Sequence, residues 1–165
     1  MSWRNIESEI QSDLEAEKLR IQKESMRSAN ISNGWQELWD GAISCLTANA
    51  EELDKKLQCA RILSVGNNLS LVLRDENHYS FENPAFPLIC LHIKCKPGNC
   101  ITVSGTKEPS AFRSEKIHLL RFTFDVDMNY QPYIDGESRG CYSPARFADL
   151  LTDMAADFFR EVAIR

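Results

Sequence analysis

The chain has 165 residues, of which 43% are hydrophobic and 26% charged, a composition typical of one globular domain rather than of a disordered or fibrous protein. Its formal net charge of −5 and its pI near 5.3 disfavour a nucleic-acid partner, because proteins that bind phosphate backbones usually carry a basic face. No apolar run approaches a membrane span and the polar start of the chain argues against a secretory signal, so we expect a cytoplasmic protein.

The first 30 residues predict a helix, because they are rich in Glu, Lys, Gln and Leu. Ile6, Ile10 and Leu14 share one face of this helix, but acidic residues interrupt any longer heptad pattern. So thin an apolar stripe cannot hold a helix by itself in water. We therefore expect residues 1–30 to pack as an arm on the domain or on a second copy of the chain. The expected interface residues are Trp3, Ile6, Ile10 and Leu14.

A second helix is predicted to begin at Ser32-Asn33-Gly34, where Asn33 offers an N-cap and Gln36 follows three residues later, as in a capping box. Apolar residues then recur at intervals of three and four, as on one face of a helix: Trp35, Leu38, Trp39, Ala42, Ile43, Leu46, Ala50, Leu53 and Leu57. The sequence thus predicts a helix that covers one face of a sheet and opens a globular core of residues 31–165.

Residues from about 60 to 136 alternate apolar and polar side chains, which predicts about six antiparallel strands. Gly66-Asn67-Asn68 suits a tight hairpin turn between the first two of them. Another hairpin is predicted around a three-residue loop, Pro97-Gly98-Asn99, since this loop keeps the apolar residues of both strands on one face. Within that loop, Asn99 is expected to take the left-handed conformation.

The register of the Pro97-Gly98-Asn99 hairpin also determines whether Cys95 and Cys100 can form a disulfide. It pairs Cys95 with Ile101 and His92 with Ser104, and it places Cys100 on the face opposite to Cys95, so these two cysteines cannot form a disulfide. In a cytoplasmic protein the six cysteines are expected to be reduced thiols, mostly packed in the core, although an even number also permits a disulfide framework.

Two polar stretches, residues 75–87 and 106–115, are predicted to be connections, apart from a short edge strand at Tyr79 and Phe81. Long connections often carry function, so both stretches are candidate functional segments. The longest strand is predicted to follow at about residues 116–126.

The last helix has the clearest start signal in the chain, because Ser143 can cap it and Pro144 suits its first position. A wide apolar stripe follows, made of Phe147, Leu150, Leu151, Met154, Phe158 and Val162. Together the elements predict an α+β fold with an antiparallel sheet of about six strands. Two N-terminal helices and one long C-terminal helix are expected to pack on that sheet, all within a single domain of residues 1–165.

Cys90 and His92 are the candidate catalytic residues, because residues two apart on a strand share a face and a histidine can activate a thiol. With His118 and Cys141 they would make a zinc site, but no Cys-x-x-Cys spacing supports one. A solvated histidine and a packed cysteine are the simpler interpretation. The sequence therefore predicts no metal and no cofactor.

Asp125, Asp127, Asn129 and Gln131 alternate like the ligands of a calcium loop. Tyr130, however, occupies the position that requires glycine in such a loop, and the flanking segments are predicted strands rather than helices. A hairpin turn with solvated carboxylates is therefore the better interpretation.

The leading functional hypothesis is a non-enzymatic protein-interaction or adaptor domain that self-associates through its first helix, or binds another protein, with no nucleic-acid or membrane partner. One alternative is a small-ligand-binding domain with an apolar pocket between the last helix and the sheet. A second alternative is an enzyme that uses the Cys90–His92 pair, which would require a perturbed pKa within a cleft.

Overall fold

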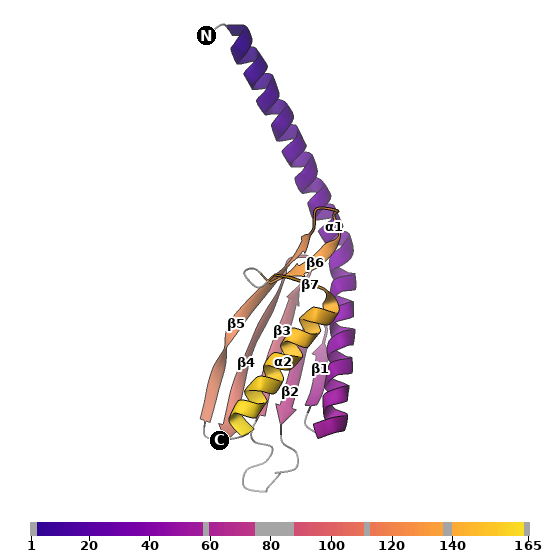
Figure 1. The fold of residues 1–165 in the computed structure, drawn as a ribbon, viewed down its shortest axis with the longest axis vertical. Helices are drawn as coiled ribbons and strands as arrows, with labels where there is room; N and C mark the ends of the chain where they lie inside the picture. The colour runs from indigo at the N-terminus through magenta and orange to yellow at the C-terminus, as the bar shows by residue number, and fades with distance from the viewer. Residues whose placement is uncertain (1–2, 58–59, 75–87, 111–112, 137–139, 164–165) are drawn as a thin grey trace.

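A computed structural model describes residues 3–57, 60–74, 88–110, 113–136 and 140–163 (Figure 1). The described chain begins with a long helix, α1 (Trp3–Leu57), and ends with a second helix, α2 (Pro144–Ala163). Between them lie seven strands: β1 (Ala60–Val65), β2 (Asn68–Arg74), β3 (Leu88–Lys96), β4 (Cys100–Ser110), β5 (Arg113–Val126), β6 (Pro132–Asp135) and β7 (Cys141–Tyr142). The fold is α+β with an antiparallel sheet, as the sequence predicted, and β7 adds a two-residue strand to the six expected.

The strands form one sheet in which each pairs with its neighbour in the sequence, so the strand order is the chain order. Helix α2 lies across β2, β3 and β4, and α1 packs beside α2 (Figure 1). Helix α1 also contacts β1 at one edge of the sheet and β5 and β6 near the other. Because strands near opposite edges reach the same helix, the sheet curls around the two helices.

The hydrophobic core fills the space between the concave face of the sheet and the two helices. Its largest fully buried side chains come from every layer: Trp39 and Leu46 of α1, Phe147 of α2, and Leu69, Leu71, Leu73, Ile89, Leu91, Ile93, Ile101, Phe122 and Ile134 of the sheet. An edge-to-face contact joins the sheet to α2, since the ring of Phe122 lies 5.0 Å from that of Phe147. Within the sheet, the ring of Phe122 also lies 6.1 Å from that of Tyr142.

The predicted register of the β3–β4 hairpin is confirmed, because Cys95 pairs with Ile101 and His92 with Ser104. The three-residue loop is also confirmed, but the residue with a positive φ is Gly98, at +68°, and not Asn99. Glycine adopts a positive φ without steric cost because it has no Cβ, so Gly98 takes this conformation more readily than Asn99. Within the described chain, Cys45, Cys90, Cys95, Cys100 and Cys141 are free thiols. Burial, helped by neighbouring Cys100, raises the pKa of Cys95 to about 11, so this thiol is protonated at neutral pH.

The prediction of two N-terminal helices is wrong, because α1 runs without a break through Ser32-Asn33-Gly34. The glycine that suggested a helix start serves instead for packing: a Cβ added at Gly34 would lie 2.6 Å from Cγ of Pro132. Asn30, just before this segment, does not cap a new helix either. Its side-chain amide donates a hydrogen bond to the Met26 carbonyl at 2.9 Å, one turn earlier in the same helix.

The predicted start of α2 is confirmed. The Arg146 amide donates a hydrogen bond to the Ser143 hydroxyl at 3.2 Å, and Pro144 is the first helical residue.

The prediction that residues 106–115 form a connection is wrong for most of that stretch. Strand β4 continues to Ser110 and β5 begins at Arg113, because the two strands extend as a paired ribbon past the helices. The expected edge strand at Tyr79 and Phe81 lies outside the described residues.

Candidate functional site

The most unusual surface of the molecule lies on the first half of α1, which extends well beyond the sheet (Figure 1). We call residues 3–26 the arm and the remainder of the described chain the body. Five large apolar side chains follow one side of the arm and are solvent-exposed: Trp3 by 69%, Ile6 by 45%, Ile10 by 54%, Leu14 by 57% and Ile21 by 55%. We call these five residues the apolar stripe.

The apolar stripe keeps a constant direction along the helix. Trp3 and Leu14 are eleven residues apart, as are Ile10 and Ile21, and eleven residues make about three turns. Fourteen residues, about four turns, separate Ile21 from Trp35, whose ring lies 6.0 Å from Phe124 in the body. The stripe is therefore the outward continuation of the face that α1 packs on the sheet.

The sequence predicted four of the five stripe residues as an interface and missed Ile21. Leu14 and Ile21 are seven residues apart, but Glu17 interrupts the heptad pattern between them, whereas the eleven-residue spacing from Ile10 leads directly to Ile21. Leu19 and Met26 are also exposed, but they lie on the opposite side of the arm.

An ion pair marks the point where the arm leaves the body. The Arg27 guanidinium donates a hydrogen bond to Oδ1 of Asp125 at 2.9 Å, and it lies 3.6 Å from Glu24. Partial burial raises the pKa of Asp125, but the hydrogen bonds from Arg27 and from the Val126 amide, with the charge of Arg27, outweigh burial and lower it. The junction is thus held by a charged contact rather than by apolar packing alone.

Cys90 and His92, the two candidates that the sequence offered for catalysis, lie close together in the structure. Cys90 and His92 lie on the sheet face that points away from the helices, with Sγ 3.5 Å from Nε2. The hydroxyl of Ser70 lies 3.2 Å from Nδ1 of the same ring. Burial, and then the charge of Glu108, raise the pKa of Cys90, so the thiol is protonated at neutral pH. This direction is opposite to the one that a thiolate nucleophile needs, and it argues against catalysis through this pair.

The residues considered for metal binding do not assemble into a site. Cys141 lies on β7, at the far edge of the sheet from β3, and the side chain of His118 is outside the described set. Among the residues that the structure describes, no three His, Cys, Asp or Glu side chains gather to hold a metal ion. At the predicted calcium-like turn, Oδ1 of Asp127 accepts the amides of Asn129 and Gln131, so this carboxylate stabilises the turn itself.

A groove lies at the end of α2, where the β4–β5 ribbon extends past the helix. Its cavity measures about 430 Å³ and is lined by Lys107, Glu115, Lys116, Ile117, Leu120, Met154 and Phe158. The ammonium of Lys107 lies 4.6 Å from the centre of the Phe158 ring and 3.6 Å from the carboxylate of Glu161. The middle of the helix–sheet interface is filled, because Phe147, Leu151 and Ala155 are fully buried. The space for a ligand that borders both α2 and the sheet therefore lies at this open end of their interface, among the described residues.

Comparisons with protein-family models, with curated proteins and with solved structures find no match to this chain. In the described part of the chain, neither helix is long and apolar enough to cross a membrane. Inference about function therefore depends on the geometry and chemistry of the molecule itself, above all on the apolar stripe of the arm.

Proposed function

We propose that the protein is a non-enzymatic interaction module that self-associates through its arm. The observation that carries this proposal is the apolar stripe, whose side chains are between 45% and 69% exposed on a helix that extends away from the body. Exposed apolar patches of this kind, bordered by charged residues, are typical of protein–protein interfaces.

The size of the stripe sets the expected strength of association. Each stripe residue still exposes about half of its surface, and complete burial of such a side chain stabilises by about 1.5–3 kcal/mol. Two arms together would therefore gain on the order of 10 kcal/mol, against an association cost of about 4–15 kcal/mol. The balance favours a reversible, concentration-dependent dimer rather than an obligate one.

Sedimentation equilibrium on the full chain, over a wide range of protein concentration, tests the proposal. The wild-type protein is expected to pass from monomer to dimer as concentration rises. The double variant Ile10→Ser, Leu14→Ser should remain monomeric, because it removes the centre of the stripe. The matched control Leu19→Ser, Met26→Ser places the same substitutions on the opposite side of the arm and should dimerise like the wild type.

Two outcomes would contradict self-association through the arm. The first is a wild-type chain that sediments as a monomer at every concentration. Equal loss of dimer in the stripe variant and in the control would show that helix propensity, and not the apolar stripe, governs assembly.

The groove at the end of α2 supports a second candidate function, the binding of a small amphiphilic ligand. Ile117, Leu120 and Phe158 offer apolar surface, and Lys107 and Lys116 offer positive charge for an acidic group. A fluorescent anilinonaphthalene sulfonate is a suitable probe because it combines both features. We expect one probe molecule to bind per chain and Leu120→Trp to abolish binding by filling the groove; binding that Leu120→Trp leaves unchanged would place the probe elsewhere.

A further inference from the structure

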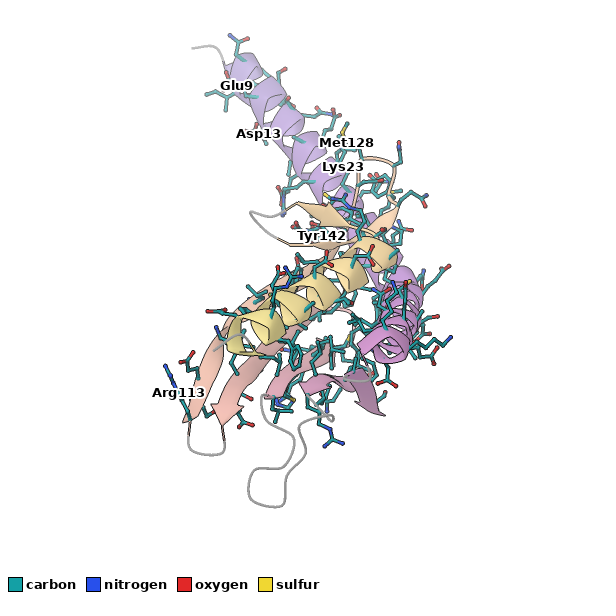
Figure 2. The ribbon with its side chains drawn as sticks, turned by 60° about the horizontal axis from the view of Figure 1, so that its bottom comes forward. Glu9, Asp13, Lys23, Arg113, Met128 and Tyr142 are labelled. Atoms are coloured by element: carbon teal, nitrogen blue, oxygen red, sulfur yellow. The ribbon has the colours of Figure 1, made fainter. Side chains whose placement is uncertain are left out.

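The arm carries its charges in two blocks of opposite sign. Residues 3–15 contain one positive and four negative side chains, a net charge of −3: Arg4, Glu7, Glu9, Asp13 and Glu15. Residues 16–26, the inner half of the arm, contain three positive and two negative side chains, a net charge of +1: Lys18, Arg20, Lys23, Glu17 and Glu24. Figure 2 shows Glu9 and Asp13 on the outer part of the arm and Lys23 nearer the body.

From this distribution we propose that two arms pair antiparallel, so that the acidic half of each copy lies against the basic half of the other. The inference rests on the self-association proposed above and specifies the partner as a second copy of this chain in a defined orientation. Packed helices lie about 8–10 Å apart, within about one Debye length at 0.1 M salt, so facing charges interact. A parallel pair would instead bring like charges together along the whole arm.

The two ends of the apolar stripe fit the same orientation. When Ile10 of one arm lies opposite Ile21 of the other, Ile6 falls opposite Ser25 and Trp3 opposite Ser28. Leu14, in the middle of the stripe, falls opposite Glu17. On this face of α1, the outer end carries the large side chains of Trp3 and Ile6. The end nearer the body carries the two serines. An antiparallel pair therefore sets large residues against small ones at both ends, which is the condition for close helix packing.

The same alignment brings charged neighbours of the stripe together. Arg20 of one copy lies between Glu9 and Asp13 of the other, and the two-fold symmetry of the pair repeats this cluster. Within its own arm, Arg20 already donates to Glu17 at 2.6 Å. The proposed pairing would place the second copy's carboxylates on the remaining side of this guanidinium, which has five donors.

An exposed methionine lies where the tip of the second arm would arrive. Met128 is 97% exposed at the β5–β6 turn, and this turn lies near the point where the arm leaves the body, since Asp125 at the end of β5 accepts a hydrogen bond from Arg27. In the antiparallel alignment Trp3 of the second copy reaches the level of Ser28, close to this turn. Methionine sulfur packs favourably against aromatic rings, so Met128 is a suitable receptor for the indole.

Salt dependence of the dimer dissociation constant, measured on the full chain by sedimentation, is the first test. An antiparallel pair should weaken as salt rises from 0.05 to about 0.5 M, because opposite charges are screened. A parallel pair should tighten over the same range. Tightening would overturn the antiparallel orientation and leave self-association standing, whereas a chain that is monomeric throughout would overturn the proposed function as well.

Charge reversal gives the second test. Glu9→Lys, Asp13→Lys should weaken the dimer about tenfold at low salt, since attraction to Arg20 becomes repulsion in both clusters. Adding Lys18→Glu and Arg20→Glu should restore most of the affinity, because the two blocks have then exchanged sign. The control Glu37→Lys, Glu51→Lys makes the same charge change on exposed body residues and should have little effect. An unchanged dissociation constant in the first variant would contradict the antiparallel pair.

Small-angle scattering of the wild-type dimer needs no variant and reports orientation directly. An antiparallel pair holds the two bodies at opposite ends, separated by the length of the arm, about 35 Å for 24 helical residues. A parallel pair places the bodies side by side. A dimer whose scattering fits two adjacent bodies would overturn the proposal, and one that fits two separated bodies would support it.

Discussion

The two halves of α1 belong to one continuous helix, yet they are stabilised in different ways. In the body, Trp39 is 1% exposed and helps to fill the core, whereas Trp3 in the arm is 69% exposed. Starting a helix is the costly step, and extending one already formed is nearly neutral for good helix-forming residues. The body therefore supplies the helix nucleus, and the arm extends it with Glu, Lys, Gln and Leu side chains. Helical structure alone thus does not indicate burial, and the apolar stripe of the arm stays exposed for the self-association that we propose.

Replacing the same residue type in the two halves should give the largest contrast. Trp39→Ala should destabilise the folded monomer by about 3–5 kcal/mol, because it leaves a cavity between α1 and the sheet. Trp3→Ala should change the free energy of unfolding by less than about 0.5 kcal/mol, as exposed substitutions usually do. Urea denaturation at a concentration where the chain is monomeric measures both. Similar losses in the two variants would show that the arm folds as part of the core.

The two glycines of α1 that face prolines offer a smaller contrast within the body. Gly34→Ala would place a Cβ 2.6 Å from Cγ of Pro132, and the rigid ring cannot move aside easily. Overpacking typically costs about 1–3 kcal/mol, which exceeds the gain of up to about 1 kcal/mol in helix propensity. Gly41→Ala, whose Cβ would lie 3.1 Å from Pro144, should be close to neutral. Thermal unfolding of both variants tests this order, and a more stable Gly34→Ala would contradict it.

The hairpin between β3 and β4 shows what the sequence can determine. A shift of one residue would have paired Ile93 with Thr102 and put Ile93 and Val103 on opposite faces, so the apolar pattern alone selected the observed pairing. The start of α2 was predictable for a similar reason, because Ser143 and Pro144 act locally, within one turn of the helix.

Features that depend on contacts between distant segments were not predictable. Gly34 looked like a helix boundary, since the sequence does not show that Pro132 packs against it almost a hundred residues later. The thiol of Cys90 and the ring of His92 were correctly placed on one face, but the raised pKa of Cys90 depends on its burial and on Glu108. The local sequence pattern therefore predicted the strands, the start of α2 and the shared face of Cys90 and His92. Contacts between distant segments determined that α1 is one continuous helix and that the pKa of Cys90 is raised.

The ion pair at the base of the arm should make a pH-dependent contribution. The pKa of Asp125 lies below its ordinary value of 3.8, so the stabilisation is present above about pH 4 and is lost as pH falls through the lowered native pKa. Asp125→Asn should cost about 1 kcal/mol or less at pH 7, because Asp125 is 22% and Arg27 44% exposed. Urea denaturation should give free energies of unfolding for wild type and variant that converge as the pH falls below the lowered native pKa of Asp125. Glu24→Gln, which removes the longer and more exposed contact to Arg27, should have a smaller effect.

The smallest effect is expected at the exposed pair within the arm. The hydrogen bond from Arg20 lowers the pKa of Glu17, yet both side chains are more than half exposed. Glu17→Gln should reduce the helical circular dichroism slightly at low salt and leave the unfolding transition of the body unchanged. This result would separate the arm from the cooperative unit that unfolds with the core. A shift of the main transition would mean instead that the two halves of α1 unfold together, and the arm would then contribute to folding as well as to assembly.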